Sequence, residues 1–344
     1  VLQELNEELT DLYQLFKEEF PTNDERLITK EMIDQLSLAS EQVLQRVSLL
    51  YQDALTIGEQ LKSYYLRYQE TFSISEQAQW SDLQTLLDSL AQQQVAFELF
   101  SEQWEARYIQ WVNVKRKTLH VQDLEASQLD QTSWYHRYKQ ILYLGGTLKI
   151  GGDRHYFAKR WGIPEAALKI ISSPYDYEQQ ARLYLPTENI SIQTSSPDQY
   201  AQYVADVVHK MADHQKRPIL VLFTSHDILN RVHQRLKMPL LHEGREVLAQ
   251  GIGGSREKLL KRFLLSKDAV LLGADSFWEG IDLPGEILQL LIVTRLPFEN
   301  PQRIQVRARN SFLESEGINP FFQEAVPHAA LRLRQALGRL IRSE

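Results

Sequence analysis

The chain has 344 residues, of which 43% are hydrophobic and 24% charged, as is typical of a globular protein of about two or three domains. The net charge of −7 excludes a wholly basic nucleic-acid coat but leaves room for a local basic groove. The chain has no cysteine, which excludes disulfides and Cys-ligated metal sites within it. No signal peptide is visible and no apolar run approaches the roughly 20 residues of a membrane span, so a cytoplasmic protein is expected.

Residues 1–121 are predicted to form long amphipathic helices. Apolar side chains recur there every three or four positions, as in Leu2, Leu5, Leu9 and Leu12. Gly and Pro are rare in this part of the chain, and Gln and Glu dominate its polar positions. Because the spacing is too uneven for a two-stranded coiled coil, an antiparallel bundle is expected.

Two aromatic clusters in this region carry cations. Residues 64–68 hold three tyrosines and Arg67, and residues 104–117 hold two tryptophans and end in Lys115, Arg116 and Lys117. Aromatic rings interleaved with cations can stack on bases and neutralise phosphates. The alternative is that the rings belong to the core and the charges form a solvated face.

The polar stretch 122–134 leads into a region of alternating strands and helices. A short apolar run at 141–144 ends in Gly145-Gly146-Thr147, whose glycines allow a tight turn, and residues 155–161 are expected to be helical. Ser196, Pro197 and Gln199 form a capping box that begins a helix ending near His214.

The remaining elements continue this alternation. Predicted strands are 190–192, 218–223, 269–272 and 288–293. Predicted helices are 224–236, the basic helix 256–265, and a helix that follows Asn300-Pro301 and carries Arg303, Arg307 and Arg309. Such alternation predicts a parallel sheet with crossover helices.

Polar residues follow several of these strands. Thr224 and Ser225 follow one, residues 275–282 follow another, and Arg295 follows a third. In open α/β sheets, ligands bind beyond the carboxyl ends of the strands. The sequence therefore predicts a ligand site at this edge of the sheet.

The last residues of the chain carry a separate signal. Gln335, Gly338, Arg339 and Arg342 stand at i, i+3, i+4 and i+7, and would share one face of a helix. Arginine suits a transferring phosphoryl group, because its planar fork stays charged and can grip two oxygens.

Four stretches resemble motifs of one family, the DinG-type, XPD-like branch of the superfamily 2 helicases. Residues 274–284, reading ADSFWEGIDLP, resemble motif V, and residues 335–342, reading QALGRLIR, resemble motif VI. Residues 222–225 resemble motif IV, and residues 144–148 resemble motif III, with Gly145-Gly146 in place of the usual Ser-Ala. The resemblance runs from about Ile141 to the end of the sequence.

The resemblance implies an α/β fold with two parts. One is a RecA-like parallel-sheet motor domain, the second of the helicase pair, and the other is an N-terminal all-α, arch-like region. The expected domains are 1–125, the helical arch-like domain; 126–163, a remnant of the first RecA-like domain with motif III; and 164–344, the second RecA-like domain with motifs IV, V and VI.

The resemblance also assigns roles to residues. The expected catalytic and nucleotide-facing residues of motif VI are Gln335, Arg339 and Arg342, with the arginines as trans-domain fingers. Glu279, Gly280 and Asp282 are expected to bind nucleotide and to couple the nucleotide state to DNA binding. The side chains of Glu279 and Asp282 could instead cap a helix N-terminus. The expected DNA-binding residues are Thr224, Ser225, Arg256, Phe277, Trp278, Arg295 and Phe298. Phe277 fits a core role equally well, whereas Trp278 is expected to be exposed.

The sequence contains no G-x-x-x-x-G-K-[ST] phosphate loop, no Asp-Glu-x-His block and no recognisable metal site. ATP and Mg²⁺ are therefore expected to bind mainly to an N-terminal RecA-like domain missing from this sequence, which we interpret as a fragment unable to hydrolyse ATP alone.

The expected function is the DNA-binding and nucleotide-sensing part of a 5′–3′ DNA helicase or translocase of DNA repair or replication, with single-stranded DNA, ATP and the missing domain as partners. The alternatives are a nuclease-associated, nucleotide-regulated protein that does not unwind DNA, and a helical scaffold that is not an enzyme. Many members of the family carry a Cys-ligated iron–sulfur cluster and some instead carry an N-terminal exonuclease domain, and this sequence does not decide between them.

Overall fold

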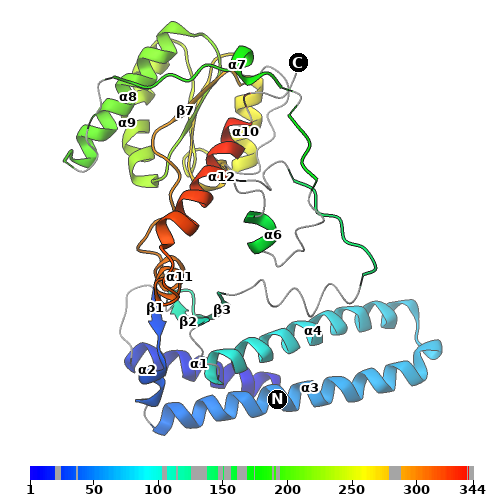
Figure 1. Ribbon diagram of the computed structural model, residues 1–344. Helices are drawn as coiled ribbons and strands as arrows, with labels where there is room; N and C mark the ends of the chain where they lie inside the picture. The colour runs from blue at the N-terminus through cyan, green and yellow to red at the C-terminus, as the bar shows by residue number, and fades with distance from the viewer. Residues whose placement is uncertain are drawn as a thin grey trace. The chain divides into compact units, whose positions relative to one another are not determined.

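A computed structural model describes the chain at residues 1–19, 25–35, 38–102, 107–113, 115–124, 138–145, 150, 156–160, 169–173, 175–187, 190, 194–278, 288–338 and 340. The chain divides into two compact units (Figure 1). The first unit comprises residues 1–129 and 300–318, and the second comprises 130–299 and 319–344. No helix within the described ranges is long and apolar enough to cross a membrane.

The second unit is built on a four-stranded parallel sheet. Its strands are β4 (Ile219–Leu222), β5 (Val247–Ala249), β6 (Val270–Gly273) and β7 (Leu290–Val293). Their order across the sheet is β5-β6-β4-β7, and all three pairings are parallel. The predicted α/β fold with a parallel sheet is therefore confirmed.

Both faces of this sheet are buried, which explains why its strands read as continuous apolar runs. Ile219, Val221 and Phe223 of the β4 segment pack on one side, against α8 (Pro197–His214) and α9 (His226–His242). Leu220 and Leu222 pack on the other side, in a cluster that includes side chains of α10 (Arg256–Leu265) and α12 (Val326–Leu337).

The helices of this unit begin where their capping residues predict. Ser196 caps α8 with the complete capping box, and the helix ends at His214 as expected. The bounds of α10 are also those predicted, whereas α9 continues past the expected end near Leu236 to His242. Shorter helical segments are α6 (Tyr156–Arg160), α7 (Tyr177–Gln180), η3 (Asp275–Phe277) and the π-helical turn η5 (Phe321–Ala325).

The apolar run at 141–144 is not part of a strand. Residues 141–145 form no strand, and Leu142 and Leu144 are 79% and 84% exposed. An apolar run becomes a buried strand only beside a neighbouring strand, and the described part of the chain offers this run none. The glycine turn after it, from Gly146, and most of the expected strand 190–192 lie outside the described residues.

The first unit combines helices with an antiparallel sheet. The helices are α1 (Leu2–Glu19), α2 (Lys30–Asp34), α3 (Leu38–Tyr68), the short η1 (Gln69–Thr71), α4 (Ile74–Glu102) and α11 (Ile304–Ser315). The strands are β1 (Glu25–Ile28), β2 (Tyr108–Asn113) and β3 (Thr118–Asp123), in the order β1-β2-β3. The helical N-terminal region is present, but the prediction that it is all-α is wrong.

The strands were missed for a physical reason. β2 is buried from Ile109 to Asn113 without alternation, so its pattern does not distinguish a strand from a buried helix. Its tyrosine, isoleucine, tryptophan and valine are all strand-favouring residue types, and this composition is the signal that could have indicated the strand.

The helices of the first unit pack over this sheet. α3 and α4 form a long pair joined by a short connection, and α1 packs against α3 (Figure 1). Their shared core includes Leu12, Val47, Tyr51, Phe97 and Phe100. α11, which lies far away in the sequence, contacts β1 and β2.

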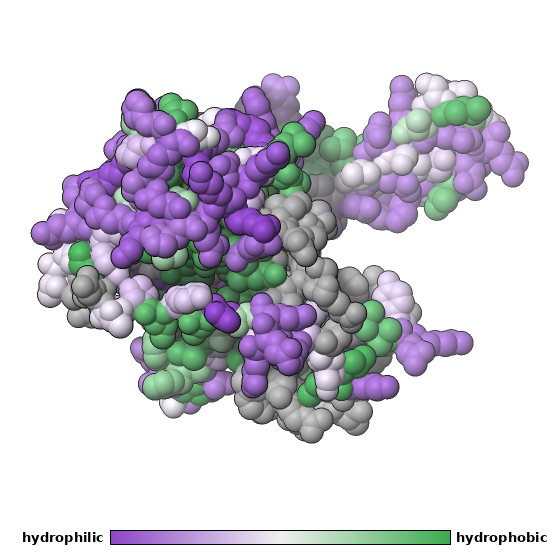
Figure 2. Space-filling model, turned by 90° about the horizontal axis from the view of Figure 1, so that it is seen from above, coloured by the Kyte–Doolittle hydropathy of each residue, from purple (hydrophilic) through white to green (hydrophobic). Residues whose placement is uncertain are grey.

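Hydrophilic residues dominate the face seen in Figure 2, with apolar patches between them. This agrees with helices such as α8 and α9, whose apolar sides face the sheet.

Candidate functional site

The carboxyl edge of the parallel sheet brings together three of the predicted polar segments. Thr294, after β7, donates its backbone N–H and its hydroxyl to the carbonyl oxygen of Leu222, at 3.1 and 2.9 Å. His226, at the start of α9, lies 3.1 Å from a carboxylate oxygen of Asp275, after β6. The segments that follow β4, β6 and β7 therefore meet at one edge.

Two helices begin at this edge with serine caps. Ser225 accepts a hydrogen bond from the backbone of Ile228 at the start of α9, and Ser255 accepts one from Lys258 at the start of α10, both at 3.4 Å. α9 follows β4 and α10 follows β5, so both N-termini belong to this edge. Helix N-termini carry partial positive charge and free N–H groups, and together with the side chain of Arg256 they suit phosphate oxygens.

The loop after β6 turns its aromatic residues into the core. Asp275 adopts a positive φ of 32°, after which Phe277 and Trp278 are buried beneath the sheet. The Trp278 indole N–H donates to the carbonyl oxygen of Phe223 at 2.7 Å, which satisfies its one polar atom. A Cβ on Gly273 would lie 2.5 Å from the Phe277 side chain, so the ring requires glycine at this position.

The expectation that Trp278 is exposed is therefore wrong, since only 1% of the residue is accessible. With both rings buried, Phe277 and Trp278 cannot stack on bases in this conformation. Their effect is to hold the loop that leads to Glu279 in place.

Gln250, which the sequence analysis did not single out, forms two hydrogen bonds to the loop after β6. Its side-chain oxygen accepts from the Ala274 backbone at 2.7 Å, and its amide nitrogen donates to the Ser276 hydroxyl at 3.3 Å. It stands directly after β5, a three-residue strand too short to produce a periodic pattern. No signal in the sequence pointed to it.

Two arginines at this edge lie over aromatic rings. The Arg295 guanidinium is 4.4 Å from the centre of the Tyr200 ring, and Tyr200 donates its hydroxyl to the Thr294 carbonyl at 2.6 Å. Arg256 is 5.8 Å from the centre of the Phe277 ring. Such contacts stabilise the cations by cation–π attraction and keep them at the edge of the sheet.

Phe298 belongs to an exposed aromatic group. Its ring stacks on Phe321 with the centroids 5.7 Å apart, and Phe322 meets Phe321 edge-on at 5.2 Å. These three residues are 37%, 51% and 70% exposed, respectively. The sequence analysis missed Phe321 and Phe322, although adjacent phenylalanines after Asn319-Pro320 are an unusual pair to find on a surface.

Motif VI is described only in part. Gln335 is exposed in the last turn of α12, which ends at Leu337 with Gly338 as its C-cap, so the described helix carries only Gln335 of the four predicted residues. Arg339 and Arg342 lie outside the described residues. The same is true of Glu279, Gly280 and Asp282 in motif V.

The two aromatic clusters in the first unit are only partly buried. Tyr65 stacks on Trp80 at 4.3 Å, whereas Tyr64 and Tyr68 are exposed. Trp111 is buried in β2, and Trp104 lies outside the described residues.

His209, Asp213 and Glu243 offer a group of possible metal ligands that the sequence analysis did not find. Their ligand atoms lie within 4.8 Å of one another, and His209 is 2.7 Å from Glu243. The buried guanidinium of Arg245 has its pKa lowered by burial, an effect that the nearby carboxylates of Asp268, Glu243 and Asp213 oppose. Two of the three possible ligands, Asp213 and Glu243, therefore lie close enough to Arg245 to interact with its charge.

The family described as helicase C-terminal domain matches residues 208–344. The apo form of an XPD helicase is similar in structure, with a TM-score of 0.51 and 18% identity, over 98% of this chain and 62% of that one. This likeness concerns the fold alone.

Three curated relatives give the range of similarity. A protein named 3′-5′ exonuclease DinG, from Bacillus subtilis, is 36% identical over 68% of this chain and 26% of its own length. The ATP-dependent DNA helicase DinG of Photobacterium profundum is 35% identical over 63% of this chain and 32% of its own length. The ATP-dependent DNA helicase YoaA of Escherichia coli is 31% identical over 58% of this chain and 30% of its own length. The chain thus spans between about a quarter and a third of these relatives.

Proposed function

This chain belongs to the DinG-type branch of the superfamily 2 helicases, with a helicase C-terminal domain at residues 208–344, and we propose that it is the DNA-binding and nucleotide-sensing part of an ATP-dependent DNA motor. The motor moves 5′ to 3′ on single-stranded DNA during repair or replication, in the cytoplasm. The observation that carries the proposal is the carboxyl edge of the parallel sheet, where two serine-capped helices begin and where Arg256 and Arg295 follow the two outermost strands, each over an aromatic ring.

In this proposal, the edge binds the phosphates of the strand. The hydroxyls of Thr224 and Ser225 and the N–H groups behind them donate to phosphate oxygens, and Arg256 and Arg295 neutralise their charge. Phe298 supplies a stacking surface that Phe321 and Phe322 extend.

The nucleotide is sensed by residues of motifs V and VI. Gln335, Arg339 and Arg342 face the γ-phosphoryl group, and Glu279, Gly280 and Asp282 couple its presence to the grip on DNA. ATP and Mg²⁺ bind mainly to a first RecA-like domain that supplies the phosphate loop. The proposal assigns residues 1–125 to the arch-like domain, residues 126–163 to the first RecA-like domain and residues 164–344 to the second RecA-like domain.

A second candidate is favoured by the name of one relative. The Bacillus subtilis relative is named as an exonuclease, not as a helicase. The motor fold would then regulate a DNA exonuclease by binding nucleotide and would not unwind DNA. Unwinding and nuclease assays on the protein at the length of its relatives distinguish the two candidates.

Single-stranded DNA is expected to bind this chain weakly, with an affinity that falls as salt rises, because each phosphate contact releases counterions. Fluorescence anisotropy against salt concentration measures the slope. Replacing Arg295 with Gln should lower the affinity and reduce the slope by about one, the share of a single phosphate contact.

Arg231→Gln is the matched control, since Arg231 on α9 is already paired with Asp198 and Asp227. The salt dependence of DNA binding by Arg231→Gln should have the same slope as that of the unaltered chain. Binding that ignores salt, or that persists unchanged when the second unit is altered and depends only on residues before Val121, contradicts the proposal.

A further inference from the structure

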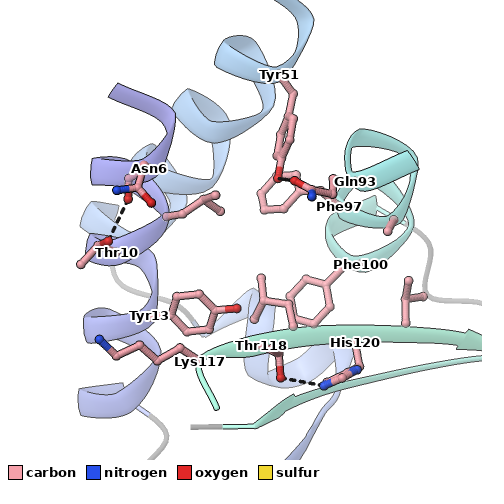
Figure 3. A pocket seen from close by; sticks show the side chains of 14 residues that line it. Asn6, Thr10, Tyr13, Tyr51, Gln93, Phe97, Phe100, Lys117, Thr118 and His120 are labelled. Carbon is pink, nitrogen blue, oxygen red and sulfur yellow. Dashed lines mark hydrogen bonds between the residues drawn. The ribbon is translucent and has the colours of Figure 1, made fainter. Parts of the chain in front are cut away.

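A cavity in the first unit is lined by residues outside the motifs used above. Its volume is about 500 Å³, and it is lined by side chains of α1, α3, α4, β3 and the turn between β2 and β3 (Figure 3). Small-ligand sites range from roughly 300 to 1,000 Å³, so the cavity has the size of such a site.

Aromatic rings form the interior of this cavity. Tyr51, Phe97 and Phe100 are almost fully buried at its wall, and the rings of Tyr51 and Phe97 lie 5.7 Å apart with a tilt of 40°. Tyr13 projects from α1 toward Phe100 across the space (Figure 3). Tyr13 is half-buried, so its ring is the one that a planar ligand entering the cavity can stack on, while the buried rings form an apolar floor.

Polar groups surround the rings at the rim. The Tyr51 hydroxyl donates to the side-chain oxygen of Gln93 at 3.5 Å, and the hydroxyl of Thr118 lies 2.7 Å from Nε2 of His120. Asn6 adds a further amide from α1. Amides, hydroxyls and an imidazole can hydrogen-bond the edge of a heterocycle whose faces are stacked.

The side chains that line the cavity include a cation but no carboxylate. None of the 14 residues that line the cavity in Figure 3 is a carboxylic acid, although the whole chain has a net charge of −7. The lining contains Lys117, and burial raises the pKa of the Tyr13 hydroxyl to about 12, so the phenol is uncharged at neutral pH. An anionic group can therefore approach this rim without repulsion from its lining.

The cation at the rim is held in an unusual conformation. Lys117 has a φ of 53°, in the left-handed region where glycine is normally found. Its neighbours Lys115 and Arg116 are also exposed, and the backbone N–H of Arg116 donates to the Asn113 side chain at 2.8 Å, which fixes the turn. Non-glycine residues held in this region cluster at ligand sites, and here the turn sets Lys117 in the lining of the cavity.

We propose that this cavity binds one nucleotide unit of a single strand, with the base against the half-buried ring of Tyr13 and the phosphate on the turn at Lys117. The proposal extends the DNA-binding function proposed above to the helical unit. A free mononucleotide has the same base and phosphate as one unit of a strand, so the test includes both a strand and a mononucleotide.

Filling the cavity is the most direct test. Ala96 lines the cavity from an exposed position on α4, so Ala96→Phe should occupy the space without removing any contact. Gln92 is exposed one turn earlier and does not line the cavity, which makes Gln92→Phe the matched control. Anisotropy is measured with an oligothymidylate and with an abasic strand of the same length, and calorimetry with thymidine monophosphate.

The expected result is an affinity for oligothymidylate about tenfold lower in Ala96→Phe, which is the effect of losing one stacked base, with little change in Gln92→Phe. The abasic strand should bind both variants equally. A second variant, Lys117→Gly, fits the left-handed backbone and removes only the charge, so it should fold normally and reduce the salt slope by about one.

Three outcomes separate this proposal from the function proposed above. If oligothymidylate binds the unaltered chain and Ala96→Phe binds it as Gln92→Phe does, the cavity proposal is overturned while DNA binding stands. If only thymidine monophosphate binds, and Ala96→Phe abolishes that binding, the nucleotide site stands and DNA binding fails. If neither ligand binds the unaltered chain, both are overturned.

Discussion

Replacing Arg339 with Ala is expected to lower kcat for DNA-stimulated ATP hydrolysis by roughly 10³-fold or more, in a protein long enough to include the first RecA-like domain. An arginine finger stabilises charge that develops on the γ-phosphoryl group, and such fingers are worth about 10³–10⁵ in rate in other phosphoryl-transfer enzymes. Because this stabilisation arises in the transition state, DNA binding should stay nearly unchanged.

Arg339→Lys is the informative companion variant. A lysine keeps the charge but cannot reproduce the bidentate fork, so it should recover little activity. If Arg339 instead forms a structural ion pair, Ala should lower the melting temperature and leave the turnover of each folded molecule normal. Melting temperature and turnover measured on the same preparations distinguish these outcomes.

Replacing Arg245 with Met is expected to destabilise the second unit by about 3–5 kcal/mol, since it removes the partner of several buried polar groups at once. Arg245 is only 4% exposed, and its guanidinium donates to the backbone carbonyls of Asp268, Ala212, Gln215 and Arg217. These carbonyls lie at the end of α8 and just before β4 and β6, so one side chain joins three elements.

Urea unfolding, followed by hydrogen exchange of peptides from α8 and β4, measures this loss within the second unit. Arg245→Lys should recover only part of the stability, because an ammonium has fewer donors in a different geometry. Arg231→Met is the surface control and should change little. A normal unfolding midpoint for Arg245→Met would show that these carbonyls find other partners.

The sequence predicted the parallel sheet well because its strands are buried on both faces. Residues 218–223 and 269–272 read as unbroken apolar runs, and the capping box at Ser196 located α8 to the residue. Each of these signals is local. β5 has only three residues and is a strand through its pairing with β6, which no local pattern reports.

The loop after β6 illustrates what local patterns leave open. Its residues were correctly expected beyond a strand, and aromatic rings next to acidic residues suggested an exposed surface. The positive φ of Asp275 and the carbonyl of Phe223, distant in sequence, decide instead that Trp278 is buried. Similarly, Arg295 was expected at the edge, but the Tyr200 ring beneath it comes from a distant helix.

The first unit was the least predictable part of the chain. The helical pattern of α3 and α4 is real, but β1, β2 and β3 depend on pairings between residues far apart, such as Glu25 with Asn113. α11 was predicted as a helix and lies with this unit, although nearly two hundred residues separate it from β3.

ATP turnover by the purified 344-residue chain tests the central claim most directly. The sequence has Arg339 and Arg342, which we propose as arginine fingers, but no phosphate loop, so we expect no hydrolysis above background, with or without single-stranded DNA. A longer protein that supplies the phosphate loop should hydrolyse ATP in a DNA-dependent manner. Robust turnover by this chain alone, abolished by Arg339→Ala, would contradict the claim that it is the second half of a two-domain motor.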